Sequence, residues 1–236
     1  MKKALIYDDE GASIQSVIAL KAYFNARSVT GAFLQDNAWI SKTDLLIIPG
    51  GRSLPFYQML TDAGNRNIIQ FVKEGGTYLG VCAGAYYAAR KTLFARGLPH
   101  EIVLDGALSF FEGEAIGPVF SEAQFDYGSE AGARIVDVIM DEKSYPVYFN
   151  GGCYFSDNPF TVARYLDNGL SAMLAFSFGK GRVVLSGVHP ELDFTTIPND
   201  ADLHHQSLRK MLCKYDAQRR ELLVKLSQEC YSDADS

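Results

Sequence analysis

The chain has 236 residues, of which 47 % are hydrophobic and 21 % charged, a composition typical of soluble globular proteins. Its formal net charge of −6 argues against nucleic-acid or anionic-membrane partners. No run of about 18 apolar residues predicts a membrane span. The four cysteines show no CxxC spacing, and no phosphate-loop motif is present. We therefore expect a cytoplasmic protein with no metal and no cofactor.

The N-terminal half alternates between strand and helix patterns. Strands are predicted at 4–7, 28–33, 44–48 and 77–81, and helices at 13–24, 65–73 and 85–93. In the first helix, Ile14, Val17, Ile18 and Ala22 recur at helical spacing. Strands that alternate with helices predict a parallel sheet with right-handed crossovers.

The C-terminal half has a different pattern. Residues 100–160 are rich in Gly, Phe and Tyr, and we expect β structure inserted in the sheet or flanking it. A hairpin is predicted where 172–178 and 182–186 flank a Gly-Lys-Gly turn. The tail, 202–228, is predicted to be one helix. Because no stretch resembles a linker, residues 1–236 are expected to form one domain, frayed over 229–236.

A candidate nucleophile follows the fourth predicted strand, in the segment Gly80-Val81-Cys82-Ala83-Gly84. The related G-x-S-x-G pattern places a nucleophile on a sharp strand-to-helix turn, where only small neighbours fit. A helix amino terminus behind Cys82 would also favour the thiolate. The pattern predicts a nucleophilic Cys82, although a buried structural cysteine at a close helix–strand contact would fit the same residues.

A candidate base and its orienting group follow the last predicted strand, in His189-Pro190-Glu191. A thiolate nucleophile needs an imidazole within hydrogen-bond reach and a third group that orients the ring. His189 and Glu191 can supply these two groups. A histidine after a strand is more often a surface residue, but the other three histidines lie in a Pro-flanked loop or on the tail helix.

A third segment, Pro49-Gly50-Gly51, ends the third predicted strand. Glycines there let backbone N–H groups face a substrate, and with the N–H of Ala83 they could form an oxyanion hole. A plain strand-to-loop turn would look the same. All three segments follow strand ends, where open α/β sheets bind ligands, so together they predict one site.

These segments resemble class I glutamine amidotransferases, and most of the chain more closely resembles the N-terminal domain of eukaryotic-type biotin protein ligases. The closer resemblance is carried by segments that include Gly11-Ala12-Ser13, Phe71-Val72-Lys73-Glu74-Gly75-Gly76, Gly117-Pro118, Gln124-Phe125, Ser129-Glu130-Ala131-Gly132-Ala133-Arg134 and Tyr148-Phe149-Asn150-Gly151-Gly152. It implies a three-layer, flavodoxin-like α/β fold whose sheet is mostly parallel with an antiparallel hairpin.

The resemblance implies a triad of Cys82 as nucleophile, His189 as base and Glu191 as orienting group. It does not imply biotin ligation, because these 236 residues contain no Gly/Arg-rich biotinyl-adenylate loop. Typical glutaminases follow the elbow with Gly-His-Gln or a similar element. Here Tyr86 and Tyr87 occupy that stretch, and we expect them to narrow the pocket.

Two functions of different classes fit these residues. The first is thiol-dependent hydrolysis or acyl transfer on a small amide, with Gly51 and Ala83 holding the oxyanion and a separate synthase or ligase subunit as a conceivable partner. The second is a non-catalytic ligand-binding or regulatory module, with Asn150 and Gly151 lining its pocket. The His-Pro-Glu segment favours the enzyme, and the missing glutaminase element favours the module. A protease- or deglycase-like relative fits less well, because no histidine directly follows Cys82.

Overall fold

A computed structural model of the chain describes residues 3–120, 132–199 and 202–232. The strands in these residues are β1 (Ala4–Tyr7), β2 (Arg27–Val29), β3 (Leu45–Ile48), β4 (Thr77–Val81), β5 (Ala89–Phe94), β6 (Ile102–Asp105), β7 (Phe111–Gly117), β8 (Arg134–Met140), β9 (Lys143–Phe149), β10 (Tyr154–Phe155), β11 (Thr161–Tyr165), β12 (Ser171–Phe178) and β13 (Gly181–Ser186). The helices are α1 (Ile14–Phe24), α2 (Gly31–Gln35), α3 (Ser53–Lys73), α4 (Ala83–Ala88), α5 (Leu203–Lys214) and α6 (Asp216–Glu229), with short 3₁₀ turns η1 (Ile40–Lys42) and η2 (Phe194–Thr196).

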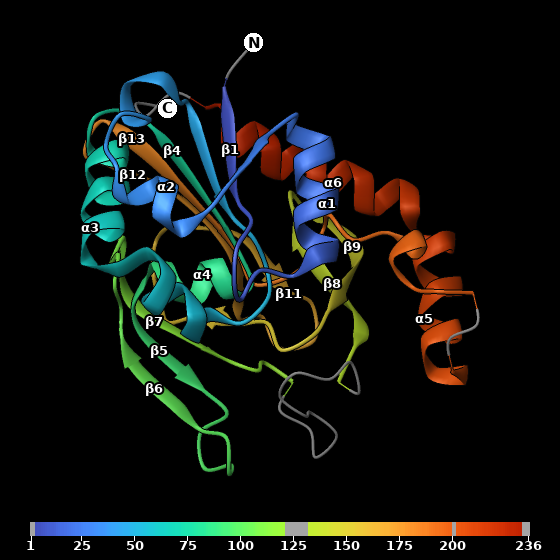
Figure 1. The fold of residues 1–236 in the computed structure, drawn as a ribbon. Coiled ribbons are helices and arrows are strands. Elements are labelled where there is room, and N and C mark those ends of the chain that lie inside the picture. The colour runs from blue at the N-terminus through green and yellow to red at the C-terminus, as the bar shows by residue number, and fades with distance from the viewer. Residues whose placement is uncertain (1–2, 121–131, 200–201, 233–236) are drawn as a thin grey trace.

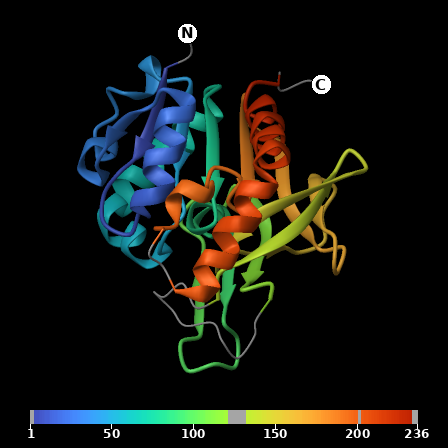
Figure 2. The same cartoon turned by 90° about the vertical axis from the view of Figure 1, so that its right-hand side faces the viewer.

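The strands form one sheet in the order β2-β1-β3-β4-β13-β12-β10-β7-β5-β6, while β11, β8 and β9 continue from β12 along a second path. The five strands β2-β1-β3-β4-β13 are parallel to one another. In Figure 1, helices α2, α3 and α4 lie on one side of this parallel part, and α1 and α6 on the other. Figure 2 looks at the side that carries α1 and α6, with α1 in blue to the left, α6 in dark red to the right and α5 in orange below them. The expected three-layer α/β fold is therefore confirmed.

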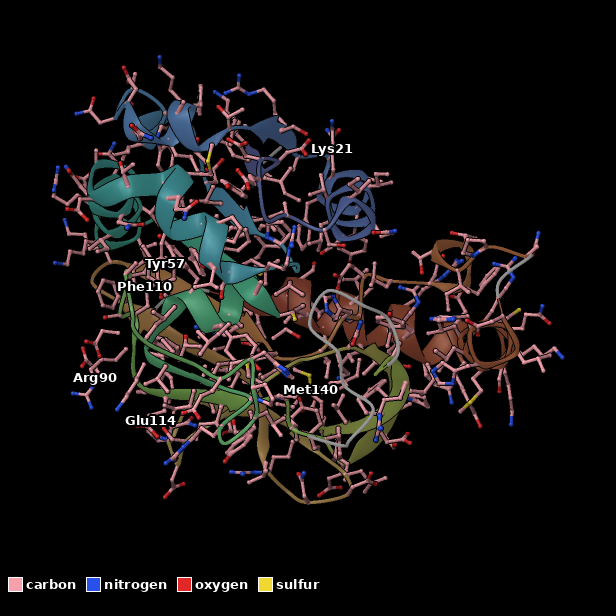
Figure 3. The ribbon with its side chains drawn as sticks, turned by 60° about the horizontal axis from the view of Figure 1, so that its bottom comes forward. Lys21, Tyr57, Arg90, Phe110, Glu114 and Met140 are labelled. Carbon is pink, nitrogen blue, oxygen red and sulfur yellow. The ribbon has the colours of Figure 1, made fainter. Side chains whose placement is uncertain are left out.

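Alternation along the strands divides the interior into two main cores. In β1, Leu5 and Tyr7 join the cluster under α3 and α4, whereas Ala4 and Ile6 join the cluster under α1 and α6. Both faces are buried, which is why these strands read as continuous apolar runs in the sequence. Figure 3 shows Tyr57 and Phe110 close to each other, and Phe110 belongs to the cluster under α3 and α4, against which Tyr57 packs. Met140 belongs to the other cluster.

The antiparallel part of the sheet is larger than the single hairpin that the sequence predicts. That hairpin exists, since β12 and β13 pair antiparallel from Met173–Ser186 to Phe178–Gly181. Antiparallel pairing then continues through β10 and β7 on one path and through β11, β8 and β9 on the other. The β structure expected in the middle of the chain is thus part of the same sheet.

Two early elements differ from the sequence prediction. The strand predicted at 28–33 stops at Val29, because the Thr30 side chain accepts a hydrogen bond from Phe33 N–H and caps α2. The helix predicted at 65–73 begins much earlier, at Ser53, and is kinked at Thr61, where φ is +56°. In the first case a cap ended the strand early, and in the second the predicted helix is the part of α3 that follows the kink.

Two later elements were also predicted wrongly. The helix predicted at 85–93 ends at Ala88, and the next residues form β5, because parallel pairing with β7 outweighs the helix propensity of alanine. The single tail helix is broken at Tyr215 into α5 and α6. The prediction that the chain frays from residue 229 onward is wrong for its first two residues, because Glu229 belongs to α6 and Cys230 is buried.

The first helix has the predicted extent but not the predicted buried face. Ile14 and Ile18 are 72 % and 64 % exposed, although their spacing matches a helical core stripe. Of the predicted stripe only Val17 is buried, and the other residues that α1 buries are Ser16, Leu20 and Phe24. The rotation matters, because it turns a hydroxyl, rather than isoleucine, toward the carboxyl ends of the parallel strands.

Candidate active site

Cys82 lies on a strained turn directly after β4. Its backbone has φ +47° and ψ −102°, a conformation that L residues rarely adopt. The turn is crowded: a Cβ on Gly80 would lie 2.6 Å from the Gly84 carbonyl oxygen, and one on Gly84 would lie 2.1 Å from that of Ile48. The small neighbours required for a nucleophile elbow are therefore present for the predicted steric reason.

His189 and Glu191 form a buried pair just beyond β13. The distance from His189 Nδ1 to Glu191 Oε1 is 2.8 Å, and the side chains are 6 % and 0 % exposed. His189 N–H also donates to the Tyr148 carbonyl at 3.0 Å, and the Tyr148 ring meets the imidazole edge-on. The backbone and the ring of His189 are thus both fixed.

The loop between these two residues is tied to α6. Arg219 donates from Nη1 to the Pro190 carbonyl oxygen at 2.6 Å, and its Nε and Nη2 bond to Asp216 Oδ1. Arg219 is buried, so its charge is balanced by this carboxylate inside the protein. No local sequence pattern predicts this contact, which joins two segments about thirty residues apart.

Gly50 and Gly51 play different parts in the structure. Gly50 N–H donates to Ser16 Oγ at 3.2 Å, and a Cβ on Gly50 would lie only 2.4 Å from His189 Cε1. Gly51 has φ +138° and forms a β-bridge with Ala12 that uses the N–H groups of the flanking residues. Gly50 therefore packs against the imidazole with its N–H already occupied, so it is not an available oxyanion donor in this structure.

The other predicted oxyanion donors remain available. Neither Gly51 nor Ala83 donates its backbone N–H to an acceptor within residues 3–120, 132–199 and 202–232. Ala83 is the first residue of α4, where helix N–H groups have no acceptor in the preceding turn. Both N–H groups therefore remain candidates for the predicted oxyanion hole.

A cavity of about 120 Å³ opens at this point. Four predicted residues line it, namely Gly51, Cys82, Asn150 and His189. The other lining residues were not predicted as site residues, and they are Ser13, Gln15, Tyr148, Leu192, Thr196 and Ile197. They come from the start of α1, the end of β9 and the segment around η2. The signals for them were short distances in the sequence, of Tyr148 from Asn150 and of Leu192 from His189.

Several predicted site residues lie behind the cavity instead of lining it. The Gly151 carbonyl oxygen accepts a hydrogen bond from the Tyr86 hydroxyl at 3.0 Å. Tyr87 is fully buried and donates to Asn65 Oδ1 at 2.6 Å. The expectation that the two tyrosines narrow the pocket is therefore wrong, because both rings turn into the protein core and support the wall behind Cys82.

The imidazole of His189 is held in its protonated form. Burial lowers the pKa of His189, but the negative charges of Glu191 and Cys82 outweigh it and raise the pKa to about 10. At neutral pH the ring therefore carries a proton on both nitrogens. The Cys82 thiol donates to the Asn150 carbonyl oxygen at 3.9 Å, so the imidazolium and the thiol meet in the same part of the structure.

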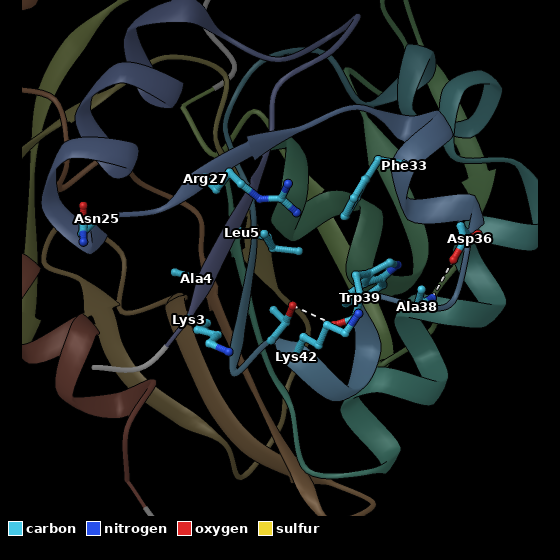
Figure 4. Close-up of a pocket in the computed structure, with 11 residues that line it drawn as sticks. Lys3, Ala4, Leu5, Asn25, Arg27, Phe33, Asp36, Ala38, Trp39 and Lys42 are labelled. Carbon is cyan, nitrogen blue, oxygen red and sulfur yellow. Dashed lines mark hydrogen bonds between the residues drawn. The ribbon is translucent and has the colours of Figure 1, made fainter.

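A larger cavity, of about 740 Å³, lies at the opposite edge of the parallel sheet. Figure 4 shows its lining, which comes from the amino ends of β1 and β2 and from α2 and η1. Its lining residues include the cations Lys3, Arg27 and Lys42 but neither cysteine nor histidine. Because size alone does not make a reaction site, the smaller cavity at Cys82 is the better candidate.

The described residues lack two features, a metal-binding cluster and a membrane-spanning helix. Within them, no group of three or more His, Cys, Asp or Glu side chains lies close enough together to hold a metal ion. No helix there combines the length and apolar character that a bilayer crossing requires.

The sheet order, the cysteine elbow after β4 and the histidine loop after the neighbouring β13 define a class I glutamine amidotransferase-like fold. Within that class, residues 2–231 match the family model of the biotin-protein ligase N-terminal domain, so the chain belongs to this family. Parts of the segments that carry the resemblance in the sequence, Gln124-Phe125 and Ser129 to Ala131, lie outside the described residues.

The chain is similar in sequence to two relatives. The chain is 37 % identical over 211 residues to a biotin–protein ligase of Schizosaccharomyces pombe, covering 79 % of this chain but only 33 % of the ligase. It thus spans about a third of that relative's length. It is 33 % identical over 226 residues to an uncharacterized protein of Chlamydia muridarum, covering 86 % of each chain.

Among solved structures, the GH42 β-galactosidase Gan42B of G. stearothermophilus superposes with a TM-score of 0.50 at 15 % identity. The match covers 96 % of this chain and 30 % of the galactosidase. At this identity the likeness concerns the fold alone.

Proposed function

We propose that this protein catalyses thiol-dependent hydrolysis or acyl transfer on a small amide. Cys82 acts as the nucleophile, His189 as the acid and base, and Glu191 as the group that orients the imidazole. The observation that carries the proposal is the meeting of two features in one cavity. A cysteine in a strained elbow and a buried imidazole that lies 2.8 Å from a buried carboxylate oxygen belong to the same site.

The chemistry follows from the positions of these groups. The Cys82 thiolate adds to the amide carbonyl carbon, and the oxygen that becomes negative is held by the N–H groups of Gly51 and Ala83. When the carbon–nitrogen bond breaks, the His189 imidazolium gives its proton to the leaving amine. The thioester is then attacked by water or an acceptor amine, which loses a proton to His189, and the Cys82 thiolate is released.

The dimensions of the site restrict the substrate. The cavity of about 120 Å³ is below the range of roughly 300–1,000 Å³ that is usual for drug-sized ligands. Its wall combines the apolar Leu192 and Ile197 with the polar Asn150 and Thr196. We therefore propose a small amide with a short side chain as substrate and, as partner, a separate synthase or ligase subunit that uses the released group.

The first test is the pH dependence of alkylation at Cys82, mapped by mass spectrometry. The exposed Cys213 provides an internal reference in the same sample. We expect Cys82 to react well below the free-thiol pKa of about 8.5 and to lose this reactivity in His189→Ala. A Cys82 as slow as Cys213, or unaffected by His189→Ala, would rule out the activated nucleophile.

One observation favours the second function, a binding module that does not turn over. Cys82 is only 5 % exposed, and the cavity in front of it is small. In that case Asn150 and Tyr148 would hold a ligand by its polar groups, and substitution of Cys82 would leave its binding intact. An inert Cys82 in the alkylation test would favour this function.

A further inference from the structure

Ser16 is a fully buried polar residue on α1 that the proposed reaction does not yet use. It lies on the face of α1 that packs on the sheet, two residues beyond the exposed Ile14. Its side chain points to the carboxyl ends of the parallel strands, where it contacts Gly50 in the loop after β3 and Glu191 in the loop after β13. A buried hydroxyl in such a place must have its hydrogen-bonding groups satisfied.

The hydroxyl is used once as donor and once as acceptor. Ser16 Oγ donates to Glu191 Oε1 at 2.7 Å and accepts from Gly50 N–H at 3.2 Å. Glu191 Oε1 is also the atom that lies 2.8 Å from His189 Nδ1. The second carboxylate oxygen, Oε2, is buried and has no hydrogen-bond partner within the described residues. All hydrogen bonds of this buried carboxylate therefore converge on one oxygen.

We propose that Ser16 is a positioning residue of the site formed by Cys82, His189 and Glu191. This inference rests on the proposed function. The hydroxyl holds the Glu191 carboxylate in the rotamer that keeps Oε1 on the imidazole. Through Gly50 it also fixes the backbone against which Cε1 of the imidazole, the atom next to Nδ1, packs. One side chain thus sets two of the surfaces that determine where the His189 ring lies.

The raised pKa of His189 depends on the carboxylate that this hydrogen bond holds in place. Other titratable or charged groups around this pair are the Cys82 thiol, the Tyr148 ring against His189, and the Arg219–Asp216 pair behind Pro190. Without the Ser16 hydroxyl, the carboxylate is held less firmly against the ring, so the pKa of His189 falls. A less stable imidazolium favours the Cys82 thiolate less, and alkylation of Cys82 then needs a higher pH.

The experiment compares the rate of Cys82 alkylation by iodoacetamide from about pH 4 to 9, a range that spans free carboxyl and thiol pKa values. The acid limb of this profile is expected to move upward by about one pH unit in Ser16→Ala. Ser16→Thr and Ser16→Val have side chains of the same shape, but only threonine keeps the hydroxyl. We expect the shift of the acid limb in the valine variant and not in the threonine variant. This comparison also tests the role of the hydroxyl if Ser16→Ala does not fold.

A matched control is Thr77→Val at the opposite end of β4. It removes a buried hydroxyl that donates to the Cys230 carbonyl oxygen, far from the site. We expect Thr77→Val to lower stability without moving the acid limb. If Ser16→Thr and Ser16→Val gave equal pH profiles while His189→Ala still abolished the reactivity of Cys82, only the proposed role of Ser16 would be overturned. If His189→Ala left the reactivity of Cys82 unchanged, the proposed function itself would be overturned.

Discussion

Gly50 lies so close to His189 that the imidazole occupies the space of a side chain at position 50. A Cβ there would be 2.4 Å from His189 Cε1 and 3.2 Å from Nδ1. We expect Gly50→Ala to push the ring away from Glu191 and to reduce the alkylation rate of Cys82 at neutral pH at least tenfold, while the protein stays folded. Kinetics of alkylation and near-UV circular dichroism measure the two effects.

Gly64→Ala is the matched control for this change. A Cβ on Gly64 meets its nearest atom at 3.6 Å, an ordinary contact, in the middle of α3. Replacement should stabilise the helix by about 0.5–1 kcal/mol and leave Cys82 unaffected. A Gly50→Ala variant as reactive as Gly64→Ala would show that the close contact does not position the ring.

The titration of His189 should depend on the charge of Glu191. In the wild-type protein the pKa of His189 is raised to about 10, because Glu191 and Cys82 outweigh the lowering effect of burial. In Glu191→Gln the burial remains and one anion is gone, so the pKa must fall and the ring should become neutral at lower pH. Nitrogen chemical shifts of the imidazole, followed against pH, measure this directly. An unchanged titration would mean that Glu191 does not stabilise the imidazolium.

The backbone at Cys82 should store strain that a glycine would release. With φ at +47°, an L residue at this position is disfavoured by about 1–3 kcal/mol. We expect Cys82→Gly to be about 1 kcal/mol more stable than Cys82→Ala in urea unfolding, despite the greater flexibility of the glycine chain when unfolded. At Cys153, which is also buried, we expect Cys153→Ala to be more stable than Cys153→Gly. The same order at both positions would contradict a strained elbow.

Arg219 and Arg220 offer a comparison of two neighbouring arginines that both pair with Asp216. The Arg219 side chain is 5 % exposed and also holds the Pro190 carbonyl, whereas that of Arg220 is 68 % exposed. We expect Arg219→Met to lower the free energy of unfolding by about 3 kcal/mol. Arg220→Met should change it by less than about 0.5 kcal/mol. Similar losses in denaturant unfolding would show that the Pro190 contact adds nothing.

Much of the parallel core could be predicted from the sequence, because its signals are local. Strands β1, β3 and β4 are short, mostly apolar runs followed by Asp8, Pro49 and Cys82, and their boundaries lie within one residue of the prediction. The β12–β13 hairpin was equally clear. In contrast, β5 consists of residues with helical propensity and became a strand through pairing with β7. Such pairing partners are far apart in the sequence, and no local pattern records them.

The candidate site divides along the same line. The sequence by itself pointed to Cys82, His189 and Glu191 as candidates, because an elbow glycine pattern and a histidine after a strand are local features of chemistry and sterics. Only the tertiary structure decided which groups hold them. Ser16 reaches Glu191 across 175 positions, and it does so because α1 buries a face other than the one its isoleucines predict. Helical spacing fixes which residues share a face, but packing against the sheet decides which face is buried.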